Sequence, residues 1–355
     1  MGKIAITLGD PPAGIGPEIV LRSLAALGER SRSVVVVGNM EVMRRASRLL
    51  GLTDILERVD VEEVPGDAVE PGRVQEEAGR QAVMAIERAV RLAMSGEVEG
   101  ICTAPPINKE AMKIAGSRFI DHTEMLAHLT GGVRGLLTLF ESGSLRTTFV
   151  TKHMPLRKAI ESLDVASVVR CILETDTSLR LLGLGGRRIA LAALNPPHAG
   201  ENGLLGKEEI DILAPAVEEA SRVADVRGGP FPSDSVYHRA ASGEFDCVVS
   251  LYHDQGGHIA SKMHDFYGTV SMNTGMPFLR TSVDHGTAFD IAWQGGKADH
   301  RSMLSAVERC FAYSPLYRRN YEAFRDEVLE RFPSYEPDIP YGLHRHPYAP
   351  VFRRL

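Results

Sequence analysis

The sequence predicts an α/β protein whose sheet is mostly parallel. Short apolar segments alternate with longer segments of helical spacing along the 355-residue chain, which is the pattern of repeated β-α-β units. Residues 34–37 are four consecutive valines, as expected of a strand that is buried on both faces of a parallel sheet. Glycines and polar residues follow several apolar segments, and α/β enzymes bind their ligands at such strand ends.

The individual elements follow from the same patterns. We expect strands at residues 3–8, 33–38, 100–104, 136–140, 147–150, 188–194, 246–250 and 269–272. We expect helices at residues 19–27, 40–50, 75–95, 165–182, 206–223, 297–312 and 316–331, with further helices that begin near residue 105 and end near residue 129. Asp164 has the position of a helix cap. Residues 53–74 are acidic and predicted to be irregular.

Length and composition limit the class of protein. A chain of 355 residues predicts two domains, and because no linker is visible we expect the chain to cross between them more than once. The net charge of −6 argues against nucleic acid as the main partner. The four cysteines are widely spaced and form no CxxC pair, which is typical of reduced thiols in a cytoplasmic protein. Residues 3–8 indicate a strand rather than a signal peptide, and no apolar run reaches the roughly 20 residues that span a bilayer.

The most informative stretch is LYHDQGGH at residues 251–258, directly after a predicted buried strand. His253 stands beside Asp254 there, and His153 and His198 also follow apolar segments. Neutral imidazole is a common ligand of zinc and related ions, so three strand-end histidines predict one shared divalent-metal site. The alternative is that each is an ordinary surface or core histidine, since no HxxxH or HExxH spacing is present.

Two further stretches have features of anion sites. The glycine-rich turn at residues 9–18 joins a strand to a helix, so its backbone N–H groups could face an anion. It is neither a GxGxxG motif nor a P-loop, and a tight β-α turn explains it equally well. His122 and Thr123 precede a helical segment, where both could donate to an anion or Thr123 could cap the helix.

Six stretches together resemble one family. They are GDPPAGIGPE (9–18), TAPPINKE (103–110), HTE (122–124), NPPHAGENG (195–203), YHDQG (252–256) and PFLRTSVDHGTA (277–288). The sequence resembles the 4-hydroxythreonine-4-phosphate dehydrogenase family, the pyridoxine-biosynthesis protein A family. It is more similar to the branch that acts on 4-phospho-D-threonate or 4-phospho-D-erythronate. The resemblance covers residues 3 to about 312 in the family's order.

The resemblance implies a homodimeric, metal-dependent, NAD(P)-linked dehydrogenase that acts on a CH–OH group. It implies two interleaved α/β domains of the isocitrate/isopropylmalate dehydrogenase type, with an active site in the interdomain cleft that is shared between subunits. We assign residues 1–125 and 270–315 to a cofactor-side domain and residues 126–269 to a domain for metal, substrate and dimerisation. Residues 316–355 form a peripheral helix and tail.

The family's functional positions fall on particular residues of this chain. Its metal ligands fall on His153, His198 and His253, so the resemblance implies that two subunits contribute these histidines to one Zn²⁺, Mg²⁺, Mn²⁺ or Co²⁺ ion. Lys262 and Asp254 are the candidate catalytic residues that move a proton. The implied substrate-binding residues are His122, Thr123, Asp234, Lys262, Ser271 and Arg280. The candidate cofactor loop resembles the adenosine loop of isopropylmalate dehydrogenases and contains His285, Gly286, Thr287, Ala288 and Asp290.

The implied reaction oxidises a phosphorylated 3-hydroxy acid, such as 4-phosphohydroxythreonine, 4-phospho-D-threonate or 4-phospho-D-erythronate, and then decarboxylates it. Asp290 favours NAD over NADP if it binds the adenosine ribose, and alternatively it only caps or packs within the loop. Ser271 stands where the family has an asparagine.

Relative to the family, one extra residue occurs in each of Pro11-Pro12, Pro105-Pro106, Pro196-Pro197, Gly256-Gly257 and Gly295-Gly296. Two alternative functions are kept. One is a metal hydrolase or aldolase that uses the same three histidines without nicotinamide. The other is a catalytically impaired, ligand-binding paralogue, which the five extra residues favour.

Overall fold

The chain leaves the first part of the fold after Arg134 and returns to it at Met276, as the computed structural model shows. Unit 1 consists of Met1–Arg134 and Met276–Leu355, and unit 2 of Gly135–Gly275. The structure describes residues 2–9, 12–105, 108–119, 122–131, 133–196 and 199–335. An α/β fold with interleaved units and a mostly parallel strand arrangement is confirmed.

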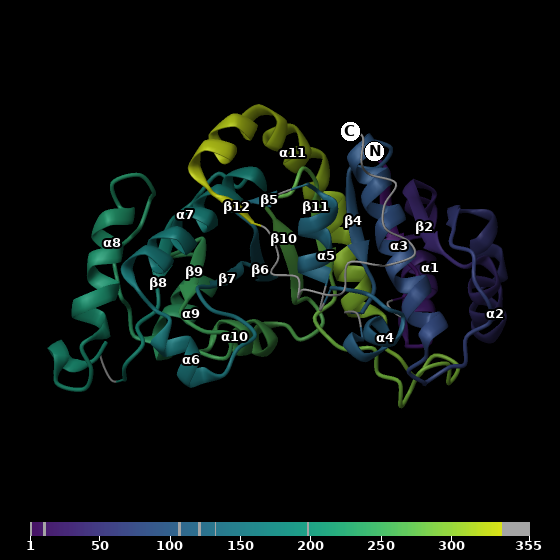
Figure 1. Ribbon diagram of the computed structural model, residues 1–355, viewed down its shortest axis with the longest axis horizontal. Coiled ribbons are helices and arrows are strands. Elements are labelled where there is room, and N and C mark those ends of the chain that lie inside the picture. Colours follow the sequence, from purple (N-terminus) through teal and green to yellow (C-terminus); the bar gives the residue numbers. More distant parts are fainter. Residues whose placement is uncertain are drawn as a thin grey trace. The chain divides into compact units, whose positions relative to one another are not determined.

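The sheet of unit 1 has the order β3-β2-β1-β4-β11, with every described pair of neighbours parallel. Figure 1 labels β2, β4 and β11 of this sheet. Its strands are β1 (Ile4–Thr7), β2 (Val34–Gly38), β3 (Asp60–Glu63), β4 (Gly100–Thr103) and β11 (Leu279–Ser282). A short antiparallel pair, β5 (Val133–Arg134) and β12 (Ser334–Tyr335), lies apart from this sheet. The valines of β2 are almost all buried, as their unbroken run predicted.

The helices of unit 1 cover both faces of its sheet. They are α1 (Gly16–Leu27), α2 (Met40–Leu50), α3 (Glu76–Ser95), α4 (Lys109–Ile114), α5 (His122–Leu129) and α11 (Arg301–Arg331), with 3₁₀ turns at Gly28–Ser33 and Thr53–Glu57. The chain moves outward from β1 to β3 and then back to β4. Because such crossovers are right-handed, α1 and α2 lie on one face and α3 on the other. α11 packs against α1 and against β11 and β4.

Unit 2 has a mixed sheet with the order β10-β6-β7-β9-β8. Its strands are β6 (Leu137–Ser142), β7 (Leu145–Phe149), β8 (Ile189–Leu191), β9 (Cys247–Ser250) and β10 (Val270–Thr274), and its helices are α6 (Leu156–Glu161), α7 (Val165–Leu181), α8 (Ala214–Ala220), α9 (Ser233–Ala241) and α10 (Gly257–His264). β6 pairs antiparallel with β7 and β10, whereas β9 pairs parallel with β7 and β8.

The two faces of the unit 2 sheet are covered by different helices. Thr148 and Thr175 share a hydrogen bond of 2.9 Å between their hydroxyls, which places α7 on one face. Leu145 of β7 packs with Val236 and Tyr237 of α9 on the other face. α10 contacts β6, β7 and β9 as well. Asp164 caps α7 as predicted, in a capping box with Ser167.

Several elements differ from the expectations. β3 lies where an irregular segment was expected, because this edge strand is acidic and half exposed and so lacks an apolar alternation. β11 was missed because three of its four residues are polar although all are buried. α10 was not predicted, because it begins directly after Gly256 at a second glycine, and glycine is a poor helix former. The helix expected at residues 206–223 is present in a shorter form, as a π-helix at Glu209–Leu213 followed directly by α8.

Residues 301–331 form one helix rather than the two that Pro315 suggested. A proline within a helix removes one hydrogen bond and costs roughly 3 kcal/mol. Burial on both sides of Pro315 offsets that loss: Phe311 and Ser314 precede it, and the fully buried Tyr317 follows and donates to Met276 O at 3.0 Å. A Cβ on Gly100 would lie 2.1 Å from Ser314 Oγ, so the close approach of β4 to α11 requires a glycine.

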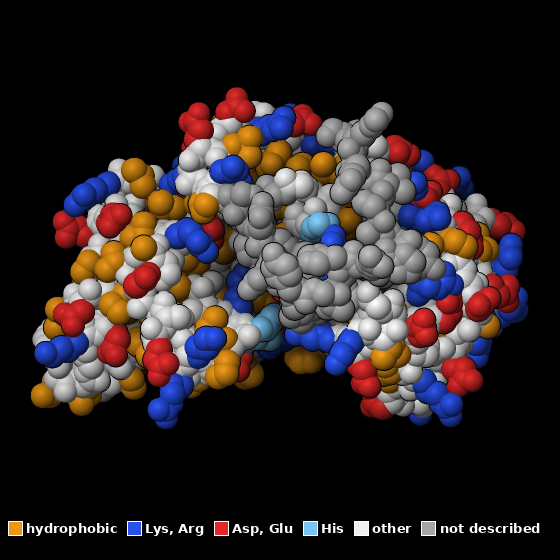
Figure 2. All heavy atoms as spheres, viewed as in Figure 1, with side chains coloured by type: hydrophobic (Ala, Val, Ile, Leu, Met, Phe, Trp, Pro, Cys, Tyr) orange, Lys and Arg blue, Asp and Glu red, His pale blue; other side chains and the backbone are white. Residues whose placement is uncertain are grey.

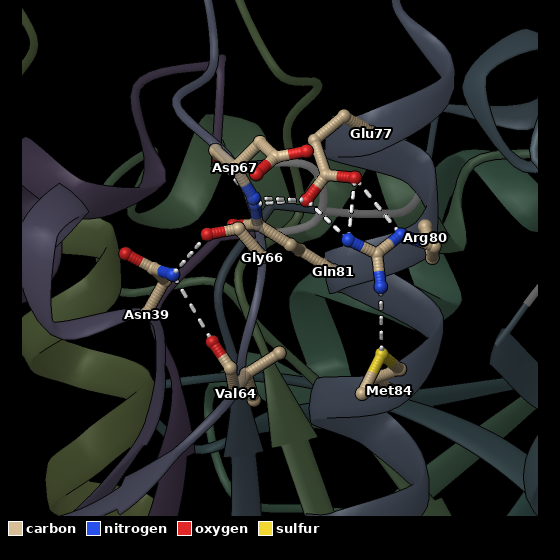
Figure 3. A network of polar contacts seen from close by, with 8 residues as sticks. All are labelled: Asn39, Val64, Gly66, Asp67, Glu77, Arg80, Gln81 and Met84. Carbon is tan, nitrogen blue, oxygen red and sulfur yellow. Dashed lines mark hydrogen bonds and ion pairs between the residues drawn. The ribbon is translucent and has the colours of Figure 1, made fainter.

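A polar network fixes the segment that follows β3 (Figure 3). Asn39 caps α2 and its amide donates to Val64 O and Gly66 O, each at 3.2 Å. Glu77 of α3 accepts from Asp67 N at 2.8 Å and forms an ion pair with Arg80. The network therefore joins α2 and α3 through this segment at the carboxyl end of β2.

Candidate functional site

His253 and His153 lie close together because β7 and β9 are parallel neighbours. Each histidine follows the carboxyl end of its strand, and the pairing continues past both ends through Val150 N to Ser250 O at 2.9 Å and Thr151 N to Leu251 O at 3.1 Å. The ring centroids of His153 and His253 are 5.6 Å apart. The structure thus brings together two histidines that are a hundred residues apart in the sequence.

Two phenylalanines and a further histidine surround His253. Its ring stacks on Phe149 with centroids 5.4 Å apart, meets Phe140 edge-on, and lies 4.7 Å from the ring of His258. Phe140, Phe149 and His253 thus form a partly apolar floor, while His153 is exposed. His258 belongs to the first turn of α10 and was not among the predicted site residues.

The donor atoms of this cluster suit a metal ion. His253 Nδ1 and Asp254 Oδ1 form a hydrogen bond of 2.7 Å, which lowers the pKa of Asp254 and leaves His253 Nε2 for a ligand. One donor atom each from His253, Asp254 and His258 lie within 4.8 Å of one another. Imidazole nitrogens and a carboxylate are ligands that Zn²⁺ and its neighbours accept, so these residues fit such an ion. His198 lies outside the described residues.

Glycine is required in the turn that carries these residues. Gly256 has φ 144°, and a Cβ there would lie 2.7 Å from Tyr237 Cε2. Burial raises the pKa of Tyr237 to about 12, so its hydroxyl stays protonated and bonds Ser250 Oγ at 2.9 Å. Gln255 Nε2 also donates to Ser233 Oγ at 3.2 Å. The turn is therefore fastened to α9, where Asp234 lies exposed in the first turn.

Polar side chains continue along the same face of the sheet. Ser271 of β10 is paired with Phe140 of β6, and directly opposite residues of antiparallel strands share a face. Asn273 lies two residues further along and donates to Thr138 Oγ1 at 3.1 Å, as does Lys152 Nζ. Lys262 follows His258 by four residues on α10, so these two side chains share one face of the helix.

A second group of predicted residues lies in unit 1, around the buried Arg280. Its Nε donates to Thr103 Oγ1 at 2.9 Å, and its Nη2 lies 3.1 Å from His122 Nδ1. A guanidinium has only donors, so Nδ1 is the acceptor and the proton of a neutral His122 is on Nε2. His122 begins α5 and Thr123 follows it, so an N–H donor, a hydroxyl and a helix N-terminus lie beside a cation.

The candidate cofactor loop lies against the turn between β1 and α1. Ile15 N donates to Thr287 O at 3.0 Å, and a Cβ on Gly14 would lie 2.8 Å from that oxygen. Ala288 has φ 45°, a conformation that is strained for a residue other than glycine. Asp290 is exposed, and its carboxylate has no partner within the described part of the chain. His285 is half-buried and Gly286 exposed, so this edge of the loop faces outward.

Comparison with known proteins identifies the family. The family model described as pyridoxal phosphate biosynthetic protein PdxA matches residues 29–310. The chain belongs to this family. A relative from Pectobacterium atrosepticum, named D-threonate 4-phosphate dehydrogenase, is 44% identical over 322 residues that cover 86% of this chain and 97% of that protein. The protein of the same name from Salmonella typhimurium is 42% identical, with coverage of 86% and 97%.

Solved structures of the PdxA family agree with this fold. The crystal structure of 4-hydroxythreonine-4-phosphate dehydrogenase from Klebsiella pneumoniae has a TM-score of 0.78 and 41% identity, and the match covers 88% of this chain and all of that one. Within the described residues, no helix of this PdxA protein has both the length and the apolar surface needed to cross a lipid bilayer.

The predicted residues fall into two groups in this PdxA protein. His153, His253, Asp254, Ser271 and Lys262 belong to the site in unit 2, and His122, Thr123, Arg280 and residues 285–290 to unit 1. His153 and His253 lie near one another within one chain, and the expectation that two subunits contribute the metal ligands stays a prediction.

Four polar residues of these sites were missed. His258 and Lys152 stand in the motifs that drew attention to His253 and His153, so proximity in sequence was an available signal. Thr103 begins the TAPPINKE stretch, but its contact with Arg280 depends on which strand neighbours β11. The contact of Asn273 depends on the register of β10 with β6, so neither contact could be predicted from the sequence.

Proposed function

We propose that this protein is a dehydrogenase that oxidises the secondary alcohol of a phosphorylated hydroxy acid, with D-threonate 4-phosphate or a close analogue as substrate. The main observation is the buried Arg280 beside His122 and the N-terminus of α5, which together offer a cation and several donors to one anion. Membership of the PdxA family and the names of the relatives support the reaction class.

The proposed ligands of a divalent ion such as Zn²⁺, Mg²⁺, Mn²⁺ or Co²⁺ are His153, His198 and His253, with His258 beside His253 as a further imidazole. Such an ion, when bound, acts as a Lewis acid on the substrate's oxygens. Asp254 would orient the ring of His253 through its hydrogen bond to Nδ1. Phe140 and Phe149 exclude water from one side of the imidazole.

Lys262 is the proposed proton acceptor, because Asp254 is already engaged by His253. Lys262 would take up the alcohol proton, and NAD, when bound, would supply a nicotinamide as the hydride acceptor. The product is a β-keto acid, which can then lose CO2. The family has an asparagine at the position of Ser271. In this chain Asn273, two residues further along β10 and on the same face of the strand, carries an amide. It is the proposed substitute for that group in binding the substrate.

The decisive experiment follows NADH formation from D-threonate 4-phosphate, 4-phospho-D-erythronate and 4-hydroxythreonine 4-phosphate, with unphosphorylated D-threonate as the comparison. We expect Arg280→Lys to raise KM for the phosphorylated substrate by about 10- to 100-fold, because the geometry of the guanidinium donors is lost. Arg319→Met, at an exposed position of α11, is the matched control.

Three outcomes would favour other functions. Turnover without nicotinamide supports a metal hydrolase or aldolase, and tight substrate binding without turnover supports an impaired paralogue. An unchanged KM in Arg280→Lys would remove the anion site from the proposal.

The metal proposal predicts that His153→Ala and His253→Ala each lower Co²⁺ affinity by at least about tenfold, since each removes an imidazole ligand. Affinity is measured by titration of Co²⁺ absorption, which is independent of activity. His264→Ala, at an exposed histidine at the end of α10, should leave affinity unchanged. If both site variants bind Co²⁺ as the unmodified protein does, the ligands are misassigned.

The cofactor proposal is NAD rather than NADP, because Asp290 is exposed on the candidate cofactor loop and would repel a 2′-phosphate. We expect Asp290→Ala to reduce the ratio of kcat/KM for NAD to that for NADP by about tenfold, equal to ~1.4 kcal/mol. Asp211→Ala, an exposed acid of unit 2, controls for net charge. Unmodified protein that prefers NADP would contradict the assignment.

We also propose a homodimer that uses the exposed face of α10. Ile259 and Met263, four residues apart, and Phe266 just beyond the helix are 54%, 83% and 58% exposed. Figure 2 shows that hydrophobic side chains reach the surface of the protein between charged ones. A second copy of this chain is the expected occupant, in keeping with the family resemblance.

The dimer proposal predicts that Met263→Glu converts the dimer to a monomer, because it would bury an unpaired charge. Molar mass by light scattering during gel filtration measures the change. Val223→Glu, at a residue that is 64% exposed elsewhere in unit 2, is the control. A dimer that survives the first substitution but not the second places the interface elsewhere.

A further inference from the structure

Glu18 is a fully buried carboxylate in the first turn of α1. Its two oxygens accept from the backbone of a distant segment: Oε2 from Trp293 N, and Oε1 from Gly296 N at 3.0 Å. A buried charge is costly unless hydrogen bonds and favourable dipoles compensate it, and the positive end of α1 supplies the dipole. The carboxylate therefore holds residues 293–296 against α1.

The same helix holds this segment at further points. Arg22, one turn after Glu18, donates from Nη1 to Gly296 O at 3.0 Å and to Ala298 O at 2.7 Å. The indole N–H of Trp293 donates to Pro12 O at 3.3 Å, and the Arg45 guanidinium lies 4.9 Å above the indole ring. The segment is thus bound to α1 and to the turn before it.

The candidate cofactor loop is anchored at its other end as well. Thr287 O accepts from Ile15 N at 3.0 Å, and Gly14 leaves room for that contact. Asp290 lies between the anchored Thr287 and the anchored Trp293, and its side chain is exposed. The conformation of residues 288–292 therefore depends on both anchors, and Glu18 provides the second one.

We propose that Glu18 is a positioning residue that sets the conformation of the candidate cofactor loop for NAD binding. It touches no cofactor itself and acts through Trp293 and Gly296. The part of this inference that concerns NAD rests on the proposed function, whereas the anchoring of the loop does not. Without the carboxylate the loop samples other conformations, so a smaller fraction of the protein has the loop conformation that binds NAD. The apparent affinity for NAD falls in proportion to that fraction.

Trp293 makes the inference testable because it is the single tryptophan of the chain. Its fluorescence reports on the anchored loop alone. Glu18→Gln preserves the shape of the side chain but turns one acceptor into a donor that faces an N–H group. We expect acrylamide to quench Trp293 more strongly in this variant, and the dissociation constant for NADH, measured by quenching of Trp293, to rise about tenfold.

Activity gives an independent readout. KM for NAD should rise with kcat and KM for the phosphorylated substrate nearly unchanged, a split that general destabilisation would not produce. Glu76→Gln, at the exposed acid in the first turn of α3, is the matched control. Glu18→Asp keeps the charge and should fall between Glu18→Gln and the unmodified protein, which guards against a glutamine variant that fails to fold.

Two results overturn the inference. One is unchanged acrylamide quenching in Glu18→Gln, which shows that the loop does not need the carboxylate. The other is stronger acrylamide quenching of Trp293 together with an unchanged dissociation constant for NADH, which shows that the loop does not bind the cofactor. If the unmodified protein binds no NADH, the proposed function fails on its own, and the acrylamide measurement still decides whether Glu18 anchors the loop.

Discussion

The parallel pairing of β7 with β9 is the constraint on which the histidine site depends. Parallel strands end at the same edge of a sheet, so residues that follow the two strands become neighbours without any long-range attraction between them. His153 and His253 occupy those two positions. Residues far apart in the sequence can thus form one ligand set, and the spacing rules that identify metal sites on a single helix do not apply to it.

Unit 1 uses the same arrangement for a different chemical purpose. β11 lies beside β4, and both carry polar groups at buried positions. A guanidinium in such a place is stable only when hydrogen bonds replace its hydration, which Thr103 and His122 help to do. Such a pre-formed set of donors loses little entropy when it binds an anion. Stability and the proposed recognition of an anion therefore draw on the same side chains.

The sequence was most informative where local pattern and burial agree. The valines of β2, the periodicity of α3 and the cap at Asp164 all led to correct elements, because each depends on residues that are close in the chain. β11 was missed for the opposite reason, since a strand of arginine, threonine and serine has no apolar signal. The same contrast holds for the sites. His153 and His253 follow apolar runs and were found, whereas Thr103 and Asn273 depend on neighbours that no local pattern reveals.

The order in which the units occur along the chain has a consequence for how the protein folds. Unit 2 is one continuous stretch, so all of its strands have left the ribosome once Gly275 has. Unit 1 has to wait, because β11 and α11 are synthesised last and β4 is covered only when they arrive. During that interval β4 has an unpaired edge and an uncovered apolar face, which is the kind of surface that aggregates or recruits chaperones. A nascent chain of this protein therefore contains all of unit 2 before the last strand and helix of unit 1 have been made. The time during which it can aggregate is set by the time needed to translate residues 135–331.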